Sequence, residues 1–110
     1  MVNAAFNVEG CADGSYRFKL VDGHKRSILL SGRHPTVEAC CECIDALKLV
    51  VRQQTGIHIL KTRGQNWFFV VMLNNTMLAQ SPLFAELDRC EEAAAEVRTV
   101  APRAVAALSA

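Results

Sequence analysis

The residues best suited to chemistry are three cysteines in one short run, Cys40, Cys41 and Cys43, with Glu42 between them. Closely spaced thiolates are ligands that zinc prefers. On a helix, however, Cys41 and Cys43 lie on opposite flanks and cannot share one ion. Cys40 and Cys43 could share one, but no second pair with suitable spacing follows. We therefore predict structural cysteines and no metal site, with a zinc ion held by Cys40 and Cys43 as the alternative.

Redox and nucleophilic chemistry also lack support in the sequence. Cys41 and Cys43 are close to the acids Glu42 and Asp45, whereas a reactive thiol needs a positive environment that lowers its pKa. The histidines have no spacing that forms a metal triad or a dyad with an acid, and no glycine-rich phosphate loop is found. The sequence predicts no catalytic residue, no cofactor and no enzymatic activity.

Length and composition are those of one globular domain. The chain has 110 residues, of which 51% are hydrophobic and 21% charged, so we predict a single domain over 1–110. The net charge of +1 gives no strong attraction to nucleic acid or to an anionic membrane. Five cysteines and no leader sequence predict reduced thiols and a cytoplasmic location. No apolar run approaches the roughly 18 residues of a membrane span, so no membrane partner is expected.

The two halves of the chain resemble each other. At a shift of about 50 residues, identical residues pair without a gap, among them Gly14 with Gly64, Phe18 with Phe68, Ser31 with Ser81 and Cys40 with Cys90. Chance matches between two apolar halves are the alternative. We interpret the pattern as two internal repeats, about 1–55 and 56–110.

The periodicity of the apolar residues predicts the same elements in each half. Alternation with a period of two indicates strands, and apolar positions three and four residues apart indicate helices. The strands are expected at 4–8, 16–20, 28–31, 57–60, 66–72, 77–80 and 105–108, and the helices near 37–53 and 83–100. The fold class is therefore α+β, with two helices packed on one face of a mainly antiparallel sheet.

Turn and cap residues set the expected ends of these elements. Asp22-Gly23 suits a hairpin turn, because glycine accepts a positive φ. Thr36 is placed to cap the first helix, and Gly56 can end it in a left-handed turn. Pro102 is expected to stop the second helix.

These motifs resemble the YegP-like family, a domain of unknown function. The resemblance covers nearly the whole chain and rests on Gly14, Tyr16-x-Phe18-x-Leu20, Ser31-x-x-His34 and Ala39-Cys40 with Ile44, and on Gly64, Phe68-x-Val70, Ser81-x-x-Phe84 and Cys90. It implies tandem strand-strand-strand-helix-strand units that exchange their last strands and form a pseudo-twofold domain. It implies no accepted activity. The chain departs from the family where Cys43 stands in place of a glycine.

One difference between the halves points to function. The residues predicted to face away from the helices are Arg17 and Lys19 in the first half, but Trp67 and Phe69, followed by Val71, in the second. The second strand is thus apolar on both sides, and its outer side must be covered by something. We predict a non-enzymatic protein-binding module that uses these five residues, either as a homodimer or as a small inhibitor of a larger protein.

Two alternatives remain open at this point. The chain termini could cover Trp67 and Phe69 within one molecule. Arg17 and Lys19 could instead combine with these aromatic residues to bind single-stranded nucleic acid, through phosphate attraction and base stacking.

Overall fold

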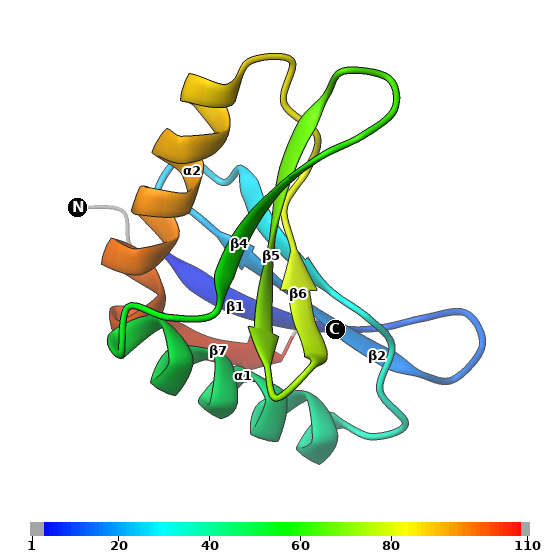
Figure 1. The fold of residues 1–110 in the computed structure, drawn as a ribbon. Helices are drawn as coiled ribbons and strands as arrows, with labels where there is room; N and C mark the ends of the chain where they lie inside the picture. Colours follow the sequence, from blue (N-terminus) through cyan, green and yellow to red (C-terminus); the bar gives the residue numbers. More distant parts are fainter. Residues whose placement is uncertain (1–3, 109–110) are drawn as a thin grey trace.

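The computed structural model describes residues 4–108, so the ends of the predicted domain lie outside the described residues. Seven strands and two long helices follow one another in two similar series (Figure 1). Their bounds are β1 (Ala5–Gly10), β2 (Tyr16–Val21), β3 (Ser27–Ser31), α1 (Val37–Arg52), β4 (Ile57–Lys61), β5 (Trp67–Leu73), β6 (Thr76–Gln80), α2 (Leu87–Val100), the short 3-10 helix η1 (Ala101–Arg103) and β7 (Val105–Leu108). Every predicted strand and helix is present.

All seven strands form one sheet in the order β4-β5-β6-β3-β2-β1-β7. Every pairing is antiparallel except that of β1 with β7. The two halves of the sheet meet at β3 and β6, which share only two residue pairs, and they cross at a steep angle in Figure 1. The predicted α+β class and the mainly antiparallel sheet are confirmed.

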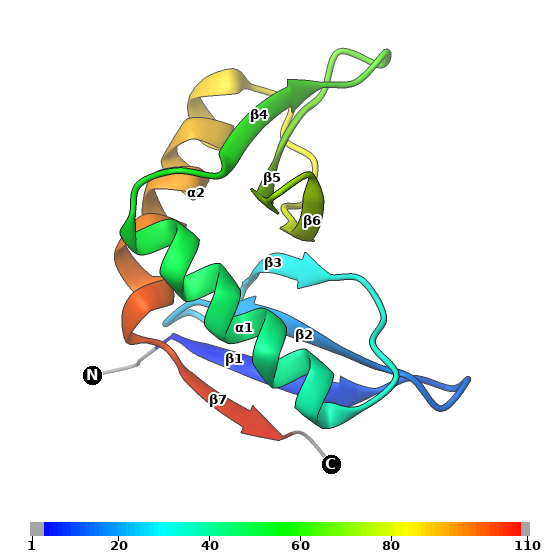
Figure 2. The same ribbon diagram turned by 60° about the horizontal axis from the view of Figure 1, so that its bottom comes forward.

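Both helices pack on the same face of the sheet. The buried stripe of α1 includes Cys40, Ile44 and Leu47, and that of α2 includes Cys90 and Ala94. These residues belong to one continuous buried cluster with the inward side chains of β1, β2, β5 and β6. Figure 2 shows α1 lying across the strands of the first half, where it contacts β1 and β2. Within residues 4–108, neither helix is long and apolar enough to cross a membrane.

The ends of α1 follow local rules, with one correction. The Thr36 hydroxyl accepts a hydrogen bond from the Ala39 N–H at 3.0 Å, as predicted for the cap. At the other end, Gln54 takes the left-handed conformation, with φ of 56°, and its N–H donates to the Val51 carbonyl. Gly56 does not end the helix. It lies so close to β5 that an added Cβ would be 2.6 Å from the Met72 carbonyl oxygen.

The second helix begins later than predicted. Residues 81–86 are not helical, because Phe84 forms an isolated antiparallel bridge with Trp67. The cap position is Glu86, whose side chain makes no capping hydrogen bond. Pro102 lies in η1 directly after the helix, in agreement with its predicted role as a stop.

The hairpin between β2 and β3 also differs from expectation. Asp22 is buried and organises the turn: its Oδ1 accepts the N–H groups of His24 and Arg26 at 2.8 and 2.9 Å. The left-handed residue is Lys25, with φ of 64°, rather than Gly23. In the equivalent hairpin of the second half, Asn74 and Asn75 are both left-handed.

Candidate functional site

Three of the predicted site residues face the opposite way from the prediction. Phe69 and Val71 are 0% exposed and belong to the buried cluster between the sheet and the helices, and Trp67 packs against the same cluster. The prediction that these side chains form an outer surface is therefore wrong. They are core residues of the helix-covered face.

The prediction is wrong because the two hairpins differ in length by one residue. Ser31 and Ser81 occupy equivalent places, because each hydroxyl accepts a hydrogen bond from a phenylalanine N–H at 2.9 Å. The two donors are Phe18 of β2 and Phe69 of β5. The sequence separation between equivalent residues of these two strands is therefore one residue larger than the separation between the two serines. A slip of one residue moves every side chain of a strand to the other face.

The outer face of β5 is nevertheless apolar. Its side chains are Phe68, Val70 and Met72, which alternate with the core residues. In register beside them are Leu60 of β4, opposite Phe68, and Met77 of β6, opposite Met72. We call these five side chains the outer apolar patch.

The outer apolar patch is hollowed, with exposed side chains around Val70, which is only 6% exposed. Leu60 is 44% exposed and Met77 46% exposed. A shallow depression of about 490 Å³ is lined by Leu60, Val70 and Met72, together with His58 and the two asparagines of the turn. Such a surface offers apolar area with polar groups at its margin, an arrangement that protein interfaces share.

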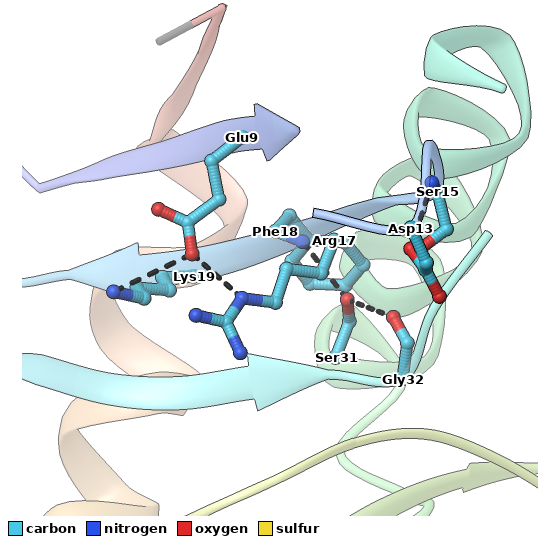
Figure 3. Close-up of polar contacts among 8 residues, drawn as sticks. All are labelled: Glu9, Asp13, Ser15, Arg17, Phe18, Lys19, Ser31 and Gly32. Carbon is cyan, nitrogen blue, oxygen red and sulfur yellow. Dashed lines mark hydrogen bonds and ion pairs between the residues drawn. The ribbon is translucent and has the colours of Figure 1, made fainter. Parts of the chain in front are cut away.

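In the first half, the same face of the sheet is charged. The Arg17 Nε is 2.6 Å and the Lys19 Nζ 3.5 Å from the Glu9 Oε1, across the pair of β1 and β2 (Figure 3). The hydrogen bond from Arg17, together with the nearby positive charges, lowers the pKa of Glu9 against the opposing effect of burial. Arg17 and Lys19 face away from the helices, as predicted, but one carboxylate partly neutralises both.

The residues of the nucleic-acid alternative are not brought together. Arg17 and Lys19 lie on the outer face of the first half, whereas Trp67 and Phe69 lie on the inner face of the second. A strand of nucleic acid could not contact both sets at once, because stacking needs aromatic faces beside the phosphate-binding cations.

Ser31 and Ser81 are buried and support the fold. Each accepts a phenylalanine N–H and donates its own proton to the next carbonyl: Ser31 to Gly32 at 2.7 Å (Figure 3), and Ser81 to Pro82 at 2.8 Å. Both hydroxyls thus donate to backbone carbonyls rather than to a side chain that could act as a general base. In the loop between β1 and β2, Asp13 accepts hydrogen bonds from Ser15, and these bonds, with Arg33, lower its pKa to about 2.

Three of the five cysteines lie in the core or pack against it. Cys40 and Cys90 are fully buried, as predicted, and burial raises the pKa of each thiol. Burial also raises the pKa of Cys43 to about 11, and its Sγ lies 3.7 Å from the Leu78 carbonyl oxygen. Over residues 4–108, no group of three or more His, Cys, Asp or Glu side chains is placed to hold a metal ion. That the protein binds no metal stays a prediction.

His34 lies between the core and the loop before α1. Its ring stacks on Phe18 with centroids 6.4 Å apart, and its buried Nε2 has no hydrogen-bond partner. The equivalent residue in the second half is Phe84, which makes the same backbone bridge. The histidine therefore takes the place of an aromatic core residue.

A second groove was not foreseen from the sequence. It has a volume of about 510 Å³ and lies between the start of β3 and α2. Its walls carry the cations Arg26 and Arg89 as well as acidic side chains of α2. No local motif marks this groove, because its two walls come from segments far apart in the chain.

Two solved structures share this fold. The protein YegP of E. coli, described as of unknown function, superposes with a TM-score of 0.91 over 99% of this chain and 95% of its own, at 16% identity. A UPF0339 protein from Shewanella oneidensis gives a TM-score of 0.90 over 96% of this chain and 91% of its own, at 10% identity. No family model and no curated protein matches the sequence. The resemblance inferred from the sequence motifs is confirmed at the level of architecture: the chain has the fold of the YegP-like proteins.

Proposed function

We propose that this chain is a non-enzymatic protein-binding module whose partner docks on the outer apolar patch. The observation that carries the proposal is the contrast between the two halves of one sheet face. The first half presents Arg17 and Lys19, both paired with Glu9, beside the single exposed leucine Leu30 of β3. The second half presents five apolar side chains, two of them more than two-fifths exposed. Exposed apolar clusters of this kind mark interaction sites.

The chemistry of the chain supports binding over catalysis. Burial raises the pKa values of Cys40, Cys43 and Cys90, so these thiols are protonated and weakly nucleophilic at neutral pH. The hydroxyls of the buried serines form hydrogen bonds with backbone groups. A cytoplasmic location, where such thiols stay reduced, is part of the proposal.

We also propose that the chain is a single domain made of two internal repeats, about 1–55 and 56–110. Several contacts recur in the two halves: the serine hydroxyl on the phenylalanine N–H, the bridge from β2 or β5 to the loop before the helix, and a fully buried cysteine at the same point of each helix. The binding patch would then have arisen by divergence of one repeat.

The patch is tested by charge substitution. Met72→Lys with Met77→Lys places two cations in the patch without changing β4, and Leu49→Lys with Leu83→Lys is the matched control, since those two leucines are 55% and 59% exposed elsewhere on the surface. Each protein is immobilised, and proteins captured from a lysate of the source organism are quantified by mass spectrometry. We expect the native chain and the control to retain at least one protein in common. The patch variant should capture roughly tenfold less of that protein or lower still, because a few anchor side chains contribute most of the binding energy of an interface.

Equal capture by the patch variant and the control would contradict the proposal. Circular dichroism and thermal unfolding verify that each variant is folded. The single change Met77→Lys provides the same comparison should the double variant be unstable, because Met77 is 46% exposed.

A further inference from the structure

The strand β4 forms one edge of the sheet, and it is exposed along its length. Among residues 4–108, no strand pairs with its outer side, and Figure 2 shows it at the upper border of the sheet. Ile59 is 37% and Leu60 44% exposed. The corresponding strand of the first half is β1, which pairs with β2 as β4 pairs with β5. Unlike β4, β1 has its other side covered by β7.

The hydrogen bonds of β5 show which backbone groups of β4 are free. The N–H and carbonyl of Trp67 both bond to Phe84, at 2.7 Å each, on the side away from β4. Likewise, the N–H of Phe69 donates to the Ser81 hydroxyl at 2.9 Å, and its carbonyl accepts the Ser81 N–H at 2.8 Å. Neither residue therefore directs its backbone groups toward β4.

The alternation of an antiparallel ladder then fixes the free groups. Lys61 lies opposite Trp67, and Ile59 lies opposite Phe69. Since these are the non-hydrogen-bonded pairs, the N–H and C=O groups of Ile59 and Lys61 point to the open edge, and those of Ile57 follow the same alternation. Three alternate residues thus present donors and acceptors at the spacing that an added strand needs.

We propose that a second copy of this chain supplies that strand, with two β4 strands pairing antiparallel about a twofold axis at Ile59. In this register Ile59 meets Ile59 of the second copy, and Ile57 meets Lys61. All three outward residues then find hydrogen-bonding partners, and no two like charges are opposed. A register centred on Lys61 would oppose two ammonium groups. One centred on Leu60 would pair Ile59 with Lys61 but leave Ile57 opposite Arg63, beyond the end of β4.

The side chains of β4 fit a copy of the same strand. Natural edge strands are blocked by proline, bulges or lysines at the edge. Here the only charged residue of β4 is Lys61 at its end, and its Nζ is held 5.1 Å from the centre of the Trp67 ring. On the outer face, Leu60 would lie beside His58 of the second copy. The outer apolar patches of the two copies would then lie side by side in the dimer. Pairing through β4 does not depend on partner binding at the patch, and partner binding at the patch does not depend on the pairing.

The register is tested by charge complementation. Under reducing conditions, sedimentation equilibrium of the native chain over roughly 10 μM to 1 mM should show monomers converting to dimers and to no larger species. Ile59→Lys and Ile59→Glu should each remain monomeric, because each variant opposes two like charges at the axis. An equimolar mixture should restore the dimer, because the opposed charges then attract. Val105→Lys and Val105→Glu are the controls on the other edge strand, where Val105 is 71% exposed, and they should leave the dimer intact.

Several results would overturn this proposal. A native chain that stays monomeric at the highest concentration, a mixture that fails to restore the dimer, or loss of association with the Val105 variants would each exclude the twofold β4 pairing. The Met72→Lys, Met77→Lys variant of the outer apolar patch should still dimerise, so failure of the partner proposal and failure of this one are distinguishable.

Hydrogen exchange gives a second test that needs no substitution. In the native chain, the amides of His58 and Leu60 should be protected at every concentration, because they face β5. The amides of Ile57, Ile59 and Lys61 should be protected only at concentrations where dimers form. Rapid exchange of these three amides in concentrated samples, or their protection in dilute ones, would contradict pairing with a second copy.

Discussion

At the scale of single residues, buried polar groups in this protein serve to fix backbone geometry. The buried polar residues of the described chain are Ser31, Ser81 and Asp22, and each accepts hydrogen bonds from backbone N–H groups. Asp22 also binds the Arg26 Nε at 3.0 Å through its Oδ2. A carboxylate in this position stabilises a five-residue turn that has no counterpart in the shorter second hairpin.

Replacing Asp22 with asparagine should reveal this role through pH. Burial opposes ionisation of Asp22, but the N–H groups of Arg26 and His24 and the Arg26 guanidinium outweigh it, so its pKa is lowered. Because this pKa is lower in the folded than in the unfolded state, the carboxylate stabilises the native state at pH values above the unfolded-state pKa near 4. That stabilisation is lost as the pH falls through the folded-state pKa. We expect Asp22→Asn to cost about 1–2 kcal/mol at pH 7, and this cost should shrink progressively as the pH is lowered below about 4, measured by urea unfolding.

Asp13→Asn is the control for this measurement, because the Asp13 carboxylate is half exposed and screened by solvent. It should have a much smaller effect at neutral pH. An equal loss for Asp22→Asn at neutral and at low pH would mean that the charge of Asp22 does not stabilise the turn.

At the scale of elements, the strands and helices could be predicted because their signals are local. Alternation marked β2, and the spacing of Cys40, Ile44 and Leu47 marked α1. The face of β5 could not be read in this way, because a strand with the sequence WFFVVML has no polar residue to break the symmetry between its sides. Its orientation depends on the register of the β5–β6 hairpin, which has a two-residue turn at Asn74 and Asn75 and a register shift between Val71 and Met72.

The end of α1 offers a prediction at this scale. Gln54 holds φ of 56°, a conformation that costs less for glycine, whereas Gln53 has φ of −79° and ends the helix in an ordinary conformation. Gln54→Gly should raise the free energy of unfolding by about 0.5–1 kcal/mol, and Gln53→Gly should lower it. The comparison is made by chemical denaturation of both variants. A loss of stability for Gln54→Gly would show that its side chain contributes more than its backbone costs.

At the scale of the whole molecule, the two faces of the sheet have separate roles. The inner face and the helices form the core. The outer face is charged over β1 and β2, whereas over β4, β5 and β6 it carries the outer apolar patch together with the polar residues His58 and Gln80. That one strand must be apolar on both sides could be predicted from the sequence. Which residues form the outer apolar patch could not, because Leu60 and Met77 reach it only through the register of β4 and β6 with β5.

Phe69 points into the core while Phe68 lies on the outer apolar patch, and alanine substitutions at these two neighbouring positions distinguish the two faces of β5. Phe69 is 0% exposed, so Phe69→Ala should lower the free energy of unfolding by about 3–5 kcal/mol through loss of burial and a residual cavity. Phe68→Ala removes a side chain that is only partly buried and should cost about 1 kcal/mol, with the fold retained. Urea unfolding of the two variants should therefore give clearly different midpoints. Equal losses, or a larger loss for Phe68→Ala, would contradict the assignment of the two faces and with it the outer apolar patch.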